Sequence, residues 1–224
     1  MTTSSSRAPR PSRRRVRLGL TAIGVATALA LGGFYVWTEY VDDRAPVPGD
    51  CADLLPTDLA TRFPGSEGVE VGGGTVETEQ EGVLQVVHCE AVGDSDEDPD
   101  HFSLQVVAYD PEDPERVDRM REMVDQGRRA REEEGFEAEY SDPPMRAVEW
   151  RSLSVGDGGY ATVSLPVEEG EVPGRMWSSL EYSLGSVRVS LFHRTEDSLA
   201  PVEVLDTLES LAVEVSERLP DPDG

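Results

Sequence analysis

The sequence predicts an α+β protein in which a single-pass membrane helix precedes one extracytoplasmic domain with a mainly antiparallel sheet covered by helices. Three observations lead to this prediction. An uncharged stretch lies near the amino terminus, short runs of β-branched residues recur along the rest of the chain, and an amphipathic helical pattern closes it. The predicted parts are a cytoplasmic Arg-rich tail (1–17), a transmembrane helix (18–38), a linker (39–50), the extracytoplasmic domain (51–220) and a tail (221–224).

The uncharged stretch 18–37 is long enough to cross a membrane. At about 1.5 Å per residue it spans roughly 30 Å, the thickness of a bilayer's hydrocarbon core. The residues before it carry Arg and no acid, whereas those after it are mainly acidic. This bias predicts a protein of the cell membrane with a cytoplasmic amino terminus. A signal peptide cleaved near residues 28–30 and a twin-arginine export signal near residues 12–17 are the alternatives.

Charge is divided unequally along the 224 residues. The 20 basic residues, all of them Arg, oppose 45 acidic residues, and the formal net charge is −25. Nucleic acid is excluded as a partner, because phosphate binding needs clustered basic side chains and these lie only in the short amino-terminal tail. Solubility or adaptation to high salt is the simplest explanation of the acidic surface.

Strand and helix patterns fill the domain. Runs of β-branched residues predict strands at 83–92, 101–110, 145–153, 159–165, 175–184 and 187–194, with a further strand near 75–79. Helical patterns predict a short helix at 56–62, a long polar helix that ends near 134, and a closing helix at 201–219. The closing helix carries a continuous apolar stripe and is predicted to cover the sheet.

Two cysteines, Cys51 and Cys89, follow the predicted membrane helix. An even number of cysteines in an oxidising compartment predicts a disulfide bond between them. A zinc site would need about four ligands, and only His88 lies beside either cysteine.

The segment Cys51-Ala52-Asp53-Leu54-Leu55-Pro56, with Cys89 about forty positions later, resembles the actinobacterial envelope proteins grouped as a domain of unknown function. Many of those are lipoproteins that open with Cys-x-x-Leu-Leu. The chain departs from them in having a helix as its anchor and in lacking a Trp soon after the second cysteine. The resemblance implies an extracytoplasmic, disulfide-bridged α+β domain, and it assigns no catalytic residue.

No catalytic constellation is recognisable, so we expect a protein that is not an enzyme and needs no cofactor. His193 alternates in phase with the apolar residues at 187–191, which predicts a core histidine. His88 and His101 lie on the two strands of one predicted hairpin and could approach each other, but further metal ligands are not identifiable.

The turn of that hairpin is the candidate metal site. Asp94, Asp96 and Asp98 match positions 1, 3 and 5 of a calcium loop. Pro99 replaces the glycine of position 6 and Gln105 the glutamate of position 12, so the segment is not an EF-hand. A solvated acidic turn is the simpler interpretation, with Ca²⁺ binding as the alternative.

The candidate interaction surface is the mixed face of the sheet that bears Trp177 and Phe192. The sequence therefore predicts a membrane-anchored accessory or protein-interaction module with an envelope protein as its partner. The alternatives are a sensor of a small ligand or Ca²⁺, and an enzyme that uses His193 with a carboxylate in a pocket.

Overall fold

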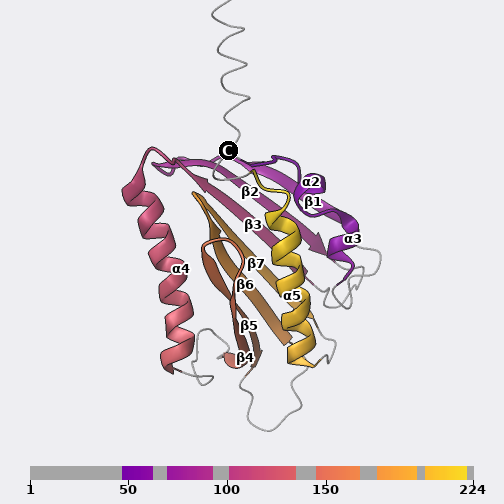
Figure 1. The fold of residues 1–224 in the computed structure, drawn as a ribbon. Coiled ribbons are helices and arrows are strands. Elements are labelled where there is room, and N and C mark those ends of the chain that lie inside the picture. Colours follow the sequence, from indigo (N-terminus) through magenta and orange to yellow (C-terminus); the bar gives the residue numbers. More distant parts are fainter. Residues whose placement is uncertain are drawn as a thin grey trace, which may run out of the picture. The chain divides into compact units, whose positions relative to one another are not determined.

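A single antiparallel sheet of seven strands organises the computed structural model (Figure 1). The structure describes residues 47–62, 70–92, 101–134, 145–166, 176–195 and 200–220, all of which belong to the compact unit Ala45–Gly224. In chain order the strands are β1 (Glu70–Val76), β2 (Val83–Val92), β3 (His101–Tyr109), β4 (Met145–Leu153), β5 (Gly158–Pro166), β6 (Met176–Leu184) and β7 (Val187–Thr195). The predicted α+β class with an antiparallel sheet is confirmed.

Strand order in the sheet is β1-β2-β3-β7-β6-β5-β4. The chain builds β1, β2 and β3 side by side and then crosses to the opposite edge, where β4 begins. It returns through β5 and β6 to β7, which pairs antiparallel with β3 at the centre. The first and second halves of the domain therefore share one continuous sheet.

Four helices lie in the described part of the chain: α2 (Cys51–Leu54), α3 (Thr57–Ala60), α4 (Pro114–Glu134) and α5 (Pro201–Ser216). The helix predicted at 56–62 is thus shorter, and the turn before it was missed. Pro56 separates α2 from α3, because proline disfavours helical backbone at the residue before it. Leu55 accordingly has φ −133° and ψ 72°, outside the helical region.

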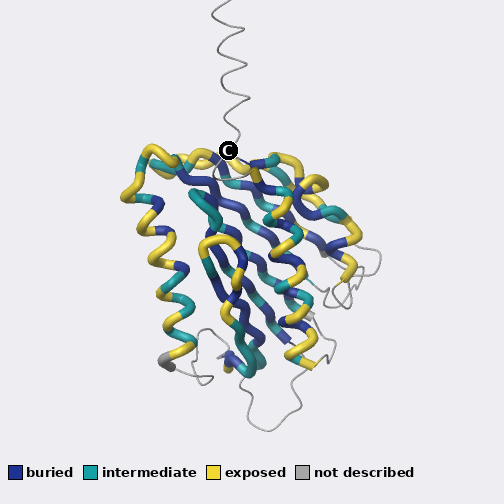
Figure 2. The backbone as a smooth tube through the Cα atoms, in the orientation of Figure 1, coloured by how far each residue is buried: buried dark blue, intermediate teal, exposed yellow. Residues whose placement is uncertain are grey.

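The larger core lies between the sheet and α5. Residues of α2, α3 and α5 pack with the same side of the strands, which we call the α5 side. The closing helix buries its apolar stripe as predicted, namely Val204, Leu205, Leu208, Leu211, Ala212 and Val215 (Figure 2). Tyr182 adds a buried hydrogen bond, since its hydroxyl donates to the carbonyl of Ala212 at 3.2 Å.

The other side of the sheet, the α4 side, has a smaller core. Val117, Met120 and Val124 of α4 pack against Val107 and Tyr109 of β3. The rest of this 21-residue helix is mostly exposed or half-buried, as its narrow apolar stripe predicted. Much of the α4 side is consequently left to polar and aromatic side chains.

The predicted cytoplasmic tail, membrane helix and carboxy-terminal tail lie outside the described residues, as does most of the linker. Among the residues that are described, no helix is long and apolar enough to cross a membrane. Val47, in the carboxy-terminal third of the predicted linker, is 2% exposed and donates its backbone N–H to Gln85 Oε1 at 3.4 Å. This end of the linker is therefore packed into the domain.

Candidate functional site: the aromatic rows of the sheet

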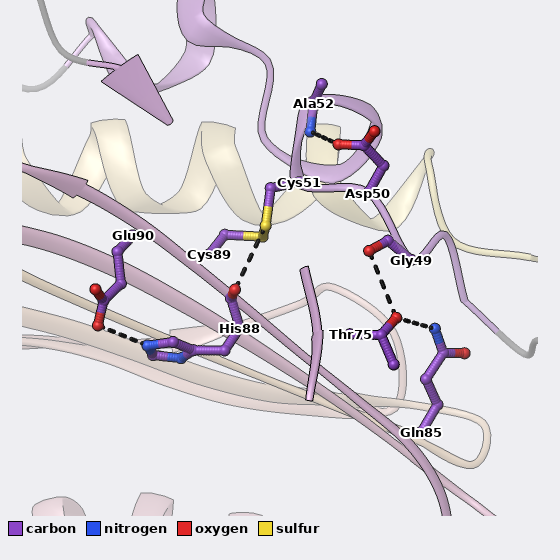
Figure 3. The surroundings of a disulfide bond; sticks show 9 residues. All are labelled: Gly49, Asp50, Cys51, Ala52, Thr75, Gln85, His88, Cys89 and Glu90. Atoms are coloured by element: carbon purple, nitrogen blue, oxygen red, sulfur yellow. Dashed lines mark hydrogen bonds and ion pairs between the residues drawn. A yellow bond between two sulfur atoms is a disulfide. The ribbon is translucent and has the colours of Figure 1, made fainter. Parts of the chain in front are cut away.

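The predicted disulfide bond between Cys51 and Cys89 is confirmed (Figure 3). Its Cα atoms are 5.5 Å apart, and both cysteines are almost completely buried. Cys51 opens α2, whose amino terminus is capped by the Asp50 carboxylate, and Cys89 lies in β2. The bond joins the start of the domain to the sheet, and we assign it a structural role.

Strand register brings polar and aromatic side chains into two rows across the α4 side. Residues that face each other in neighbouring antiparallel strands point to the same side of a sheet. The first row comprises Glu90, Ser103, Phe192, Ser179, Thr162 and Trp150. The second comprises His101, Arg194, Trp177 and Ser164. We call these ten residues the aromatic rows.

Trp177 and Phe192, the predicted interaction pair, meet at the centre of the aromatic rows. Their rings pack edge to face with centroids 5.1 Å apart, and the His101 ring lies 6.4 Å from that of Phe192. Such edge contacts suit the ring quadrupoles and hold the two rings in place. Both side chains keep part of their surface exposed. Strand alternation placed them correctly, while their role in binding stays a prediction.

A charged cluster holds α4 beside the aromatic rows. Tyr160 donates its hydroxyl to Glu181 at 2.6 Å, and Arg188 donates to the same carboxylate at 2.6 Å. The Arg131 guanidinium of α4 lies 4.4 Å from the centroid of the Tyr160 ring, within cation–π distance. Burial, together with the charge of Glu181, raises the pKa of Tyr160. Tyr160 therefore remains a protonated donor, and the cluster fixes the helix.

His193 is a core residue on the α5 side, as predicted, with 1% of its surface exposed. Ser178 Oγ lies 3.4 Å from its Nδ1 atom, and the Phe102 ring lies 6.2 Å away. Burial lowers the pKa of His193 to about 4, and the charge of His101 adds a smaller effect in the same direction. A neutral, enclosed imidazole fits a packing role, while the enzyme hypothesis stays untested.

The two hairpin histidines are not brought together. His88 pairs with Gln105, whereas His101 pairs with Val92, four positions further along β2. His88 Nε2 instead lies 2.8 Å from the Glu90 carboxylate. The hydrogen bond between them lowers the pKa of Glu90. Within the described ranges no group of three or more His, Cys, Asp or Glu side chains could hold a metal ion. The acidic candidates Asp94, Asp96 and Asp98 lie outside those ranges.

Sequence reasoning named only Trp177 and Phe192 of the aromatic rows as a contact surface, and the buried Thr162 is among the residues that it missed. Thr162 is 4% exposed, and its Oγ1 atom has no hydrogen-bond partner in the described part of the chain. Such an atom typically costs about 1–3 kcal/mol of stability. No local sequence signal marks it, because its burial depends on strands that are distant in the chain.

No family model matches the chain, and no curated protein matches it. A comparison with solved structures gives the extracellular domain of PknH from Mycobacterium tuberculosis, with a TM-score of 0.48 and 12% sequence identity over 75% of this chain and 93% of that chain. The resemblance to actinobacterial envelope proteins of unknown function stays a prediction.

Proposed function

We propose that this protein is a membrane-anchored, extracytoplasmic accessory or interaction module, and that the aromatic rows are its contact surface. The membrane anchor is the uncharged stretch 18–37 predicted from the sequence. One observation carries the choice of surface. Trp177 and Phe192 remain partly exposed on a sheet face whose neighbouring side chains are mainly polar.

Aromatic rings that remain exposed to water gain free energy when a partner covers them. Aromatic side chains bury large areas when they contact a partner, and they are enriched at the centres of protein interfaces. Ser179 and Ser103 flank Phe192 in its row. Arg194 and Ser164 flank Trp177 in the other row, so polar side chains surround the rings. A hydrophobic centre with a polar surround is the usual arrangement of a non-obligate interface.

Crosslinking in cells of the native host tests this function. A photoreactive amino acid is placed at Ser179 of the full-length chain, and a control probe at Met123, which is 42% exposed on α4. We expect one dominant envelope adduct from the first position only. Trp177→Ala with Phe192→Ala should abolish that adduct, while Arg129→Ala on the exposed side of α4 should preserve it.

Other outcomes decide against this surface. If the adduct survives the double alanine substitution, or forms equally from both probe positions, the aromatic rows are not the contact surface. Reproducible absence of any adduct from folded protein would favour the ligand-sensor alternative. Thermal unfolding of each variant shows whether a lost adduct reflects lost folding.

A further inference from the structure

β1 forms an edge of the sheet with which no further strand pairs in the described part of the chain, while α2 lies near β1 and Thr75 Oγ1 donates to the Gly49 carbonyl at 3.5 Å (Figure 3). β1 is the outermost strand of the sheet, and in the described part of the chain its backbone bonds only to β2. Most of its residues are exposed, and Gly72, Gly73 and Gly74 leave the middle of the strand without side chains. A Cβ atom at Gly72 would meet no heavy atom within 4 Å. Another strand can therefore approach this edge closely.

An open groove of about 600 Å³ lies at the β1–β2 hairpin. Its lining residues are Thr75, Val76, Glu77, Thr78, Glu79, Leu84 and Gln85. Val76 and Leu84 are 47% and 48% exposed, although large apolar side chains are usually covered. The groove thus offers an apolar pair beside the unpaired backbone of β1.

The charged side chains around the groove are acidic, and this favours a basic occupant over a second copy of the chain. Glu77 and Glu79 line it, Glu70 begins β1, and all three side chains are exposed. No basic residue is among the lining residues. A second copy of this chain, paired through β1, would bring carboxylates together across the strands, which is unfavourable. A basic segment would instead meet complementary charge.

We propose that the edge of β1 and this groove form a docking site for an extended, basic peptide segment of a partner protein. The segment adds to the sheet beside β1 through backbone hydrogen bonds, as peptides do at other open sheet edges. Its alternate side chains point to opposite sides, so apolar residues contact Val76 and Leu84 while Arg or Lys residues reach Glu77 and Glu79. This site is separate from the aromatic rows and does not depend on the function proposed for them.

Peptide binding to the full-length chain in detergent tests the docking site. The probe is a short fluorescent peptide in which Val and Arg alternate, with two controls: a peptide that alternates Val and Glu, and the Val-Arg peptide with N-methylated backbone amides. We expect only the unmodified Val-Arg peptide to bind, with an affinity that falls as salt rises. Hydrogen exchange should slow at the amides of β1 when this peptide is bound.

Matched substitutions locate the binding. Val76→Ser with Leu84→Ser should weaken it about tenfold or more, by removing the apolar contacts. Glu77→Gln with Glu79→Gln should weaken it about fivefold and flatten its salt dependence. The control is a pair of serine substitutions at Val202 and Val213, two valines of α5 that are 50% and 43% exposed. The control pair should leave the affinity within about twofold.

Three results of the peptide-binding experiment would overturn the proposal. They are absence of Val-Arg peptide binding, equal binding of the acidic or N-methylated control, and equal weakening by the α5 control pair. Dimerisation of the chain through β1 that the Val-Arg peptide does not displace would equally overturn it, and would assign this edge to a second copy.

Discussion

Removal of the disulfide bond gives the most direct test of how the domain is held together. We consider Cys51→Ala with Cys89→Ala. The bond joins residues 38 positions apart, and for a loop of that length the chain-entropy model gives about 4 kcal/mol of stabilisation at 25 °C. The cysteines also pack in the larger core with Leu54 and Leu55 of the first turns, so both ends of the loop are held in the native state.

Urea unfolding of the unit at residues 45–224, followed by circular dichroism, measures this effect. We expect the free energy of unfolding to fall by about 3–5 kcal/mol and the dependence on urea to steepen, because the unfolded chain expands without the cross-link. Wild-type protein treated with reductant keeps both sulfur atoms and thereby separates the loss of the cross-link from the loss of packing.

Two results would refute this reasoning. A loss below about 1 kcal/mol in the double variant would mean that the first turns stay bound to β2 without the bond, or that the unfolded chain is already compact. An effect of reductant on the double variant as large as on the wild type would mean that the reductant acts elsewhere.

Three further predictions concern His193, Gly127 and Thr162. Because burial lowers the pKa of His193 to about 4 while the unfolded value is near 6.5, the unfolded chain binds the proton first as pH falls. The stability due to neutral His193 is therefore complete above about pH 6.5, and it falls by about 3 kcal/mol towards pH 4. His193→Leu should remove this part of the pH dependence. If urea unfolding at several pH values gives the same pH dependence of the unfolding free energy in wild type and variant, the prediction is wrong. Gly127→Ala should destabilise the protein by about 1–2 kcal/mol despite the higher helix propensity of alanine, since the new Cβ lies 2.7 Å from Tyr160 atoms. In a Tyr160→Ala background the same change should stabilise, and stabilisation in both backgrounds would disprove the clash. Thr162→Val should raise the free energy of unfolding by about 1 kcal/mol, because it removes a buried hydroxyl that has no partner in the described part of the chain, whereas a loss of that size would reveal a bound water.

Local patterns located most elements of the domain. The predicted helix 201–219 and α5 (Pro201–Ser216) begin at the same proline, because its apolar stripe and first-turn proline are local signals. The strands predicted at 175–184 and 187–194 are present as β6 and β7, and Gly185 in the turn between them has a φ of 57°, which favours glycine. The start of the domain was less predictable, since the turn of α2 before Pro56 was missed and α3 is shorter than the helix predicted at 56–62.

Alternation along a strand also predicted which side chains share a side of the sheet. It placed His193 in the core, and it placed Trp177 and Phe192 together on the opposite side. The membrane anchor rests on composition alone, and the partner of the aromatic rows stays a proposal.

The sequence by itself therefore determined the α+β class, the disulfide bond, most element positions and the sidedness of individual strands, because each depends on neighbours within a few residues or on counting cysteines. Only the tertiary structure decided the strand order, in which β3 pairs with β7. That pairing joins the two halves of the aromatic rows, because it places Ser103 beside Phe192 and His101 beside Arg194. The same order puts β1 at one edge of the sheet, with β2 as its strand partner in the described part of the chain. These features depend on which distant strands meet, and such pairing is set by burial of the whole sheet rather than by any local pattern.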